Sequence, residues 1–361
     1  MDIVGPAKSA LPSEIDVLMA RIADSAAVTD RAGVSRETVD QLAAAGLLGT
    51  ALPAQEQREL AERIAMADAT TWFCWVQHQT PLRTLAGDAP GVVDAASDAL
   101  RVKYLPGMRS GELLAAVAFA HVRRPGSPNP VATRVDEGWQ FDGTLDWVTS
   151  WDIADVVMVM AQGSGEDSET LVCSFLPAGR GPTTAGLTPG EPLDLLAMGG
   201  THTRPLTLDS VVVPDDHVVL VDRAAWLESD ARKTSDVNPA TFGIARGAID
   251  ELDELATQRG DERLRALADT LAHQVRDVRS RAYTAADEDG SVEDRLALRA
   301  QALDLCVQAA LAVVTARAGA AMQAGRSAER RMREALFLQV QAQTAATRAA
   351  SLDLILSRFS S

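Results

Sequence analysis

Histidines and cysteines are few in this sequence, and their spacing forms no familiar catalytic or metal centre. Its 361 residues include five histidines and three cysteines, and neither set is spaced as a zinc site requires. The cysteines contain no CxxC pair, which indicates buried thiols in a reducing compartment. No GxSxG run marks a nucleophilic serine. We therefore expect no metal centre and no hydrolase triad. The residues concerned are His78, His121, His202, His217, His273, Cys74, Cys173 and Cys306.

Three other places in the sequence contain side chains that could take part in binding or catalysis. The run WVTS, residues 147–150, places a tryptophan close to two hydroxyl side chains in a segment predicted to be a strand. By itself this run is most simply part of a sheet core. His121 ends a strand-like segment, where a histidine is more often a structural residue than a catalytic one. The run ERRMRE, residues 329–334, is most simply a solvated helix face with i,i+4 ion pairs.

The overall charge excludes several classes of partner. The formal net charge is −16, whereas a nucleic acid or an anionic membrane surface requires a basic face. The start of the chain lacks the basic and apolar stretches of a signal peptide. The most apolar window, 303–322, is interrupted by Asp304, Gln308 and Arg317, and indicates a buried helix. We expect a cytoplasmic protein that binds neither nucleic acid nor membrane.

The pattern of apolar residues predicts an α+β multidomain fold. Residues 1–110 are alanine-rich with helical spacing, and they predict an N-terminal helical domain. Residues 111–222 contain short runs rich in β-branched residues between Gly, Pro, Asp and Ser clusters, which predict a small antiparallel β domain. Residues 223–361 carry four long apolar stripes joined by short links, which predict a C-terminal four-helix bundle. The fourth helix is expected from about Ala328 toward Leu356.

Four stretches occur in a distinctive order along the chain: GWQFDGTLDWVTSWDIADVVMVMA, MGGTHTRPLTLDSVVVPDDHV, FGIARGAIDEL and ERRMREALFLQVQAQT. Together they cover most of the chain from Gly111 to Leu356. In this order they resemble the acyl-CoA dehydrogenase superfamily, and most closely its flavin-dependent monooxygenase-like branch. The resemblance implies a flavin, either FAD or FMN. It places Trp147, Val148, Thr149 and Ser150 along the flavin ring. It places Phe119 and His121 near the pyrimidine end of the ring.

The sequence also departs from the family at three functional places. The family's Thr-Glu motif is replaced here by the sequence AHVRRPGSPNP. The family's stretch that reaches the adenine and pyrophosphate of FAD is absent. This second loss suits FMN, a loosely held reduced flavin, or no flavin. The usual catalytic glutamate falls on Ala342, whose methyl group cannot accept a proton. Some members place that glutamate on the first bundle helix, which corresponds here to Asp236, although Asp236 also suits a helix cap.

These departures leave two functions open. The first is an acyl-CoA dehydrogenase-like flavoprotein oxidoreductase of monooxygenase type, fed by a separate flavin reductase and acting on a small molecule or an acyl thioester. The second is a non-catalytic or partner subunit of a heteromeric acyl-CoA dehydrogenase-like complex. A standard fatty acyl-CoA dehydrogenase needs a base that the sequence does not supply. In either case, the alanine-rich bundle and the resemblance predict a homodimer or homotetramer.

Overall fold

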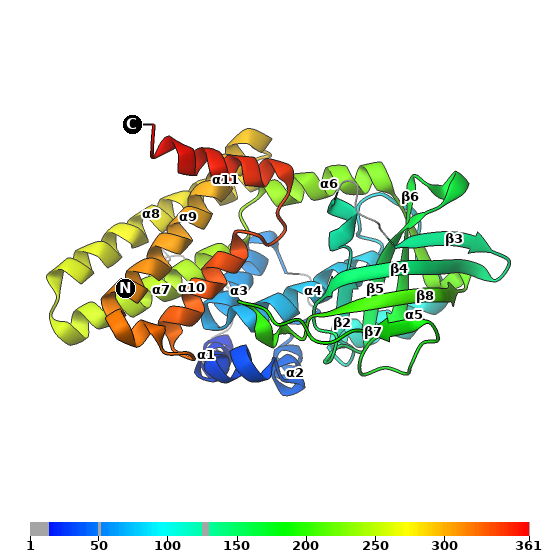
Figure 1. Ribbon diagram of the computed structural model, residues 1–361, viewed down its shortest axis with the longest axis horizontal. Coiled ribbons are helices and arrows are strands. Elements are labelled where there is room, and N and C mark those ends of the chain that lie inside the picture. The colour runs from blue at the N-terminus through cyan, green and yellow to red at the C-terminus, as the bar shows by residue number, and fades with distance from the viewer. Residues whose placement is uncertain (1–13, 50–51, 125–129, 361) are drawn as a thin grey trace.

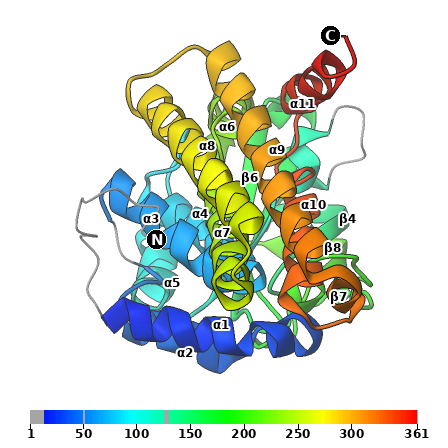
Figure 2. The same cartoon turned by 90° about the vertical axis from the view of Figure 1, so that its left-hand side faces the viewer.

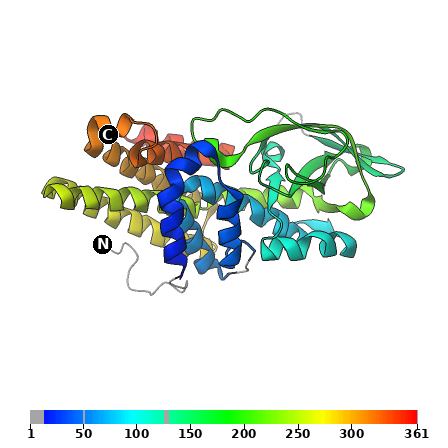
Figure 3. The same ribbon diagram turned by 90° about the horizontal axis from the view of Figure 1, so that it is seen from below.

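The computed structural model describes residues 14–49, 52–124 and 130–360. The molecule is elongated, with a β sheet at one end and a bundle of helices at the other (Figure 1). Five helices precede most of the sheet in the described chain: α1 (Glu14–Ala32), α2 (Arg36–Ala44), α3 (Ala54–Ala67), α4 (Ala69–Ala86) and α5 (Asp98–Ser110). Helices α1 and α2 lie across the lower side of the bundle, and α5 lies beside the sheet (Figure 3).

Helix α4 bridges the two ends of the molecule. It begins at Asp68, whose side chain accepts a hydrogen bond from the Thr71 backbone N–H, and it ends at Gly87 in the left-handed region. Both are favourable helix ends, because the carboxylate satisfies a free N–H and glycine tolerates a positive φ. Within this helix, residues spaced i, i+3, i+4 and i+7 lie on one face.

The sheet has nine strands within the described residues. Their order is β1-β9-β6-β5-β3-β4-β8-β7, and β2 pairs with β5. Most pairs are antiparallel, as expected, but β2 and β3 run parallel to β5. The strands are β1 (Val92–Asp94), β2 (Ala115–Ala118), β3 (Val131–Val135), β4 (Gly138–Val148), β5 (Val156–Gly163), β6 (Thr170–Pro177), β7 (Leu187–Pro189), β8 (Arg204–Val213) and β9 (Val218–Asp222).

Strand β5 shows how the sheet is held from both sides. Val156, Met158 and Met160 pack into the core that contains α5 residues such as Leu100. The intervening Val157 and Val159 pack into a second core with Trp139 and Phe141. This alternation follows from the two-residue period of a strand. The sheet is therefore a rigid base for the residues at its strand ends.

The bundle contains the expected helices, with one difference. Helices α7, α8 and α9 run side by side, and α10 lies along them (Figure 2). The predicted fourth helix is broken, because α10 ends at Leu338 and α11 begins at Ala345. The helices of this part are α6 (Arg223–Ser235), α7 (Pro239–Arg259), α8 (Glu262–Asp287), α9 (Val292–Arg317), α10 (Ser327–Leu338) and α11 (Ala345–Ser357). The predicted fold class is confirmed.

The bundle shares its core with the N-terminal helices. Leu60 and Ile64 of α3 belong to one apolar cluster with Ile244 and Leu252 of α7. Glu62 of α3 lies inside this contact with no exposed surface. The N-terminal helices and the bundle are consequently packed as a single body.

The run 329–334 is not the solvated face that its sequence suggests. Arg330 and Glu334 are both buried and form an ion pair of 2.9 Å. The Arg330 guanidinium also lies 3.7 Å from the carboxylate of Asp68. Packing of α10 against α7 and α9 has placed these charges inside, where each needs a partner.

One helical segment, Val292–Met322, is long and apolar enough to cross a membrane by length and composition, with a mean hydropathy of 1.6 over its best window. Core helices of water-soluble proteins pass the same test, and 33% of that window is buried within this chain. The segment comprises α9 and the short 3-10 helix after it, and it packs against α7, α8, α10 and α11.

Candidate functional site

A cavity of about 690 Å³ lies where the helices meet the end of the sheet. Its size is typical of pockets that hold a cofactor or another ligand of drug size. Helix α4 supplies one wall through Phe73, Val76, Gln77 and Thr80. These residues have i, i+3, i+4, i+7 spacing and therefore share one face of the helix.

The opposite walls come from strand ends and loops. β2 and the turn that follows it contribute Val117, Phe119 and Ala120, and the end of β4 contributes Trp147 and Thr149. The loop 195–203 and the end of α10 with its following turn complete the lining. The ring of Phe337 packs edge-on against Phe73, with 4.8 Å between centroids, and joins two of the walls.

The structure brings together four of the positions that the sequence singled out. Phe119, Trp147, Thr149 and Ala342 all line this cavity. Val148 is buried within the sheet core instead. Ser150 is also fully buried, with a φ of +68°, and its backbone N–H donates to the Thr201 carbonyl at 2.8 Å. Both hold the strand end in place, while their neighbours contact the cavity.

Three threonine hydroxyls form a chain at the sheet side of the cavity. The Thr201 hydroxyl donates to the Met198 carbonyl at 2.7 Å, so it accepts from Thr203 at 2.8 Å. The Thr203 hydroxyl has then used its proton, so it accepts from Thr149 at 3.2 Å. A hydroxyl has one proton and two lone pairs. Thr149 therefore presents hydrogen-bond acceptors to a ligand.

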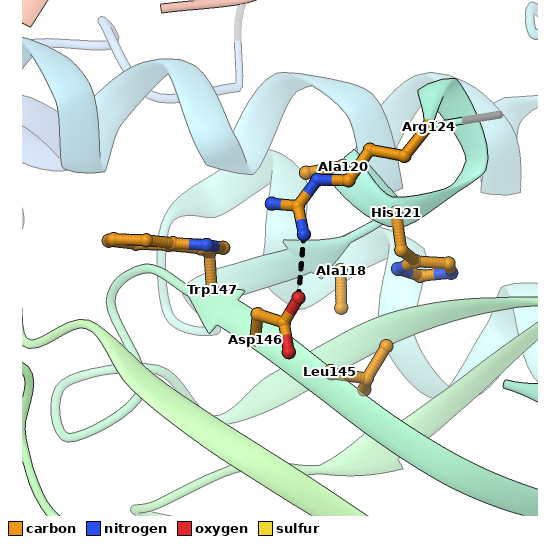
Figure 4. A pocket seen from close by; sticks show the side chains of 7 residues that line it. All are labelled: Ala118, Ala120, His121, Arg124, Leu145, Asp146 and Trp147. Carbon is orange, nitrogen blue, oxygen red and sulfur yellow. Dashed lines mark hydrogen bonds and ion pairs between the residues drawn. The ribbon is translucent and has the colours of Figure 1, made fainter. Parts of the chain in front are cut away.

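The charged groups of the cavity are both arginines, and both are paired. The Arg123 guanidinium donates to both carboxylate oxygens of Asp230 at 2.7 Å. Arg124 donates to Asp146 at 2.6 Å, across the face of β4 and beside Trp147 (Figure 4). No Asp, Glu, His, Lys, Cys or Tyr is among the described residues that line the cavity. The described part of the lining thus contains no side chain that accepts a proton near neutral pH.

His121 lies beside this cavity but not on its wall. Its Nε2 donates to the Met160 carbonyl at 2.7 Å, and burial lowers the pKa of the imidazole. Figure 4 shows His121 and Trp147 on either side of the Arg124–Asp146 pair. The pocket between them has only about 10 Å³, which is close to the room for one water molecule. Part of the segment after His121, residues 125–129, lies outside the described residues.

Asp236 also lies away from the cavity. It follows α6, and its carboxylate accepts from the guanidinium of Arg295 at 2.6 Å. Ala342, in contrast, lines the cavity in the turn between α10 and α11, with a φ of +50°. The position at which the resemblance predicts the family's base therefore lines the cavity, and it carries a methyl group.

Several lining residues were not anticipated from the sequence. Gln77 and Thr80 are polar residues on an otherwise apolar helix face, and that contrast was the available signal. The loop residues 195–198 have no pattern that separates them from other turns. All three cysteines are buried free thiols, and burial raises the pKa of each to about 12. Within the described ranges, no cluster of three or more His, Cys, Asp or Glu side chains could hold a metal ion.

Comparisons with known proteins agree on the fold. No protein-family model matches the chain. A 2-methylacyl-CoA dehydrogenase from Solanum tuberosum is 28% identical over 123 residues, which is 32% of this chain and 28% of that protein. An isovaleryl-CoA dehydrogenase from Oryza sativa subsp. japonica is 28% identical over 134 residues, which is 36% of this chain and 31% of that protein. The match thus spans less than a third of the length of either curated relative.

Solved structures match over nearly the whole chain. Butyryl-CoA dehydrogenase from Megasphaera elsdenii has a TM-score of 0.77 at 16% identity, covering 98% of this chain and 100% of that one. FkbI, for biosynthesis of a methoxymalonyl extender unit, has a TM-score of 0.73 at 19% identity, covering 95% and 99%. KijD3, solved with FMN and a dTDP-linked amino-keto sugar, has a TM-score of 0.74 at 19% identity, covering 99% and 95%. The resemblance to the superfamily is confirmed, and at these identities it establishes the fold.

Proposed function

We propose that this chain, which has the acyl-CoA dehydrogenase fold, is a cytoplasmic flavin-dependent oxidoreductase of monooxygenase type. One observation carries the proposal: the cavity is large enough for a flavin, yet its described lining contains no side chain that accepts a proton near neutral pH. Dehydrogenation next to a thioester carbonyl requires such a base, and a positioned base contributes about 10²–10⁴-fold in rate. Oxygen transfer to a group that is already nucleophilic does not require one.

The residues present suit a flavin. Phe119, Trp147 and Phe337 supply aromatic surface for a flat ring system, and Thr149 supplies an acceptor for a ring N–H group. Arg123 and Arg124 also line the wall, where each is paired with an aspartate. When bound, a flavin supplies the redox chemistry, by accepting a hydride or, once reduced, by activating dioxygen. The chain's own residues bind and orient it and exclude water from the apolar walls.

The identity of the flavin and its electron source belong to the same proposal. The sequence lacks the family's stretch for adenine and pyrophosphate, which favours FMN or a loosely held reduced flavin. A loosely held reduced flavin needs a separate reductase as its source. The substrate is then a small molecule or an acyl thioester that enters the cavity beside the ring.

The test compares the wild type with Ala342→Glu. Purified protein is denatured, any released flavin is identified by chromatography, and FMN and FAD are added back. We expect flavin to bind both proteins. Under anaerobic conditions, a panel of acyl-CoAs should bleach the flavin of Ala342→Glu faster than that of the wild type by about 10²-fold or more, because the carboxylate restores a base.

Two results would count against the proposal. Failure to bind oxidised or reduced FMN or FAD supports the non-catalytic or partner-subunit alternative. Rapid bleaching of the wild type shows that a base acts from outside the described lining. The matched variant Gln343→Glu adds a carboxylate to the same turn at an exposed position away from the cavity, and it should leave the rate unchanged.

A further inference from the structure

The turn between α10 and α11 contains three alternate glutamines with different surroundings. The Gln339 side chain donates to the Leu303 carbonyl at 3.2 Å, and the Gln343 side chain donates to the Gln339 carbonyl at 2.9 Å. Both side-chain amides thus donate to backbone carbonyls and stabilise the turn. Of the three, Gln341 is the one that lines the cavity.

A buried arginine fixes this turn against the rest of the protein. Arg299 of α9 donates to the Gln341 carbonyl at 2.9 Å and to the Thr234 carbonyl at 2.6 Å. The Gln341 backbone N–H donates to the Phe337 carbonyl at 3.0 Å. Burial lowers the pKa of Arg299 to about 10, so the side chain stays protonated at neutral pH and keeps its donors. The backbone of Gln341 is therefore held at both its N–H and its carbonyl.

Asn238, at the start of α7, fixes the orientation of the Gln341 side-chain amide. Asn238 is the N-cap of α7, and its Oδ1 accepts from the Ala240 backbone N–H at 3.1 Å. Its Nδ2 is then the group that faces Gln341, and it donates to Oε1 at 3.0 Å. Reversing the Gln341 amide would set two N–H groups against each other. Oε1 is thus engaged outside the cavity, and Nε2 is left as a donor.

The cavity therefore has a defined polar pattern. Gln341 offers N–H groups that have no acceptor within the described chain, and Thr149 offers an acceptor from the sheet side. Both arginines are paired with aspartates. The remaining surface near Gln341 is apolar, from Leu336, Phe337 and Val340. A site with this pattern suits an uncharged ligand that carries an oxygen acceptor beside an apolar group.

We propose that Gln341 binds the substrate by donating from Nε2 to a carbonyl oxygen on an uncharged acyl group. Asn238 and Arg299 are its positioning residues. This inference deepens the proposed function and rests on it only in placing the substrate in the same cavity. It assigns to the position beside Ala342 a hydrogen-bond donor rather than a proton acceptor.

The test uses two probes that differ in one carbonyl. S-butyryl-N-acetylcysteamine has the thioester oxygen, and S-butyl-N-acetylcysteamine is the matching thioether without it. Their dissociation constants are measured by calorimetry on the full-length protein with its flavin bound. The wild type should prefer the thioester by about threefold to tenfold, as expected for one neutral hydrogen bond.

Three variants separate this role from a structural one. Gln341→Leu should abolish the preference while leaving the affinity for the thioether within about twofold. Asn238→Asp keeps an N-cap acceptor but removes Nδ2, so the Gln341 amide turns and presents Oε1 to the cavity. The preference should then disappear or reverse, with the thermal midpoint nearly unchanged. Gln343→Leu, in the same turn but outside the cavity, should behave as the wild type.

The outcomes distinguish this inference from the proposed function. No preference in the wild type, failure of the thioester to bind, or a preference that survives Gln341→Leu overturns the inference. If Gln341→Leu weakens flavin binding and leaves the preference intact, the amide serves the flavin and the inference is also wrong. Absence of flavin binding in every protein overturns the proposed function. The same probes are then titrated into the flavin-free protein, where a thioester preference that Gln341→Leu abolishes still supports the role of Gln341.

Discussion

Two buried carboxylates of the helical part differ in how completely they are paired. Both oxygens of Glu62 accept from arginine or tyrosine donors. Asp68 accepts from the backbone and hydroxyl of Thr71 with one oxygen, while its other oxygen has no hydrogen bond and lies 3.7 Å from Arg330. Burial, with the nearby charge of Glu334, raises the pKa of Asp68 to about 6.

The first prediction is that Asp68→Asn changes how stability depends on pH. The pKa of Asp68 is higher in the folded state than in the unfolded state, so ionising it costs stability as pH rises from about 4 to 6. Asparagine keeps the N-cap and does not ionise. The free energy of unfolding of the variant, relative to wild type, should therefore rise by about 2–3 kcal/mol between pH 4 and pH 7.

Urea unfolding at the two pH values gives this difference. The comparison with wild type is necessary because burial lowers the pKa of His78 to about 4, so His78 contributes an opposite slope between pH 6.5 and 4. Asp261→Asn, at the N-cap of α8, controls for replacing a capping aspartate. A relative stability that is the same at both pH values contradicts the prediction.

Among the elements, α3, α7 and α8 meet at Glu62. Its carboxylate accepts from Arg246 of α7 at 2.9 Å, and from Arg279 at 2.7 Å and the Tyr283 hydroxyl at 2.5 Å, both of α8. Removing a buried carboxylate leaves two guanidinium groups without their partner. Glu62→Ala should therefore lower the free energy of unfolding by about 3–5 kcal/mol.

Chemical denaturation of Glu62→Ala beside Glu56→Ala measures this effect. Glu56 is on the same helix and forms no ion pair in the described part of the chain, so its loss should cost less than about 1 kcal/mol. Equal effects of the two substitutions would show that the buried cluster adds nothing to the packing of these helices.

The order of elements was readable from the sequence because it depends on local periodicity. The break after α10 was not. Residues 339–344, QVQAQT, contain no glycine or proline, and Ala342 adopts a φ of +50° without being a residue type that favours it. The turn is held by Arg299, which lies about forty positions earlier in the chain. Gln341 was missed for the same reason, since its role depends on Asn238 from another helix.

At the scale of the whole molecule, one end carries apolar surface that its own core does not use. Of the residues in α11, Thr347 is the buried one. Leu352 and Leu356 of α11 are 57% and 63% exposed, and Leu311 of α9 is 51% exposed. Helices α9 and α11 contact each other, and exposed leucines on neighbouring helices are a feature of protein interfaces.

We therefore expect a dimer or tetramer assembled through α9 and α11. The double substitution Leu352→Asp, Leu356→Asp should convert it to a smaller species, because burying two carboxylates in an apolar contact is unfavourable. Light scattering at micromolar concentration measures the mass. Val102→Asp, an exposed position of α5 beside the sheet, should leave the mass unchanged. A monomeric wild type contradicts the prediction.

The packing of α3 against α7 also has a consequence for synthesis of the chain. Leu60 and Ile64 of α3 share their core with Ile244 and Leu252, yet the ribosome makes α3 long before it makes α7. At about 5–20 residues per second, the interval between them is roughly 10–30 s. During that time α3 has α1 and α4 as native partners, but the side that packs against α7 lacks its own. We therefore expect slower elongation through the middle third of the chain to prolong the exposure of this side of α3.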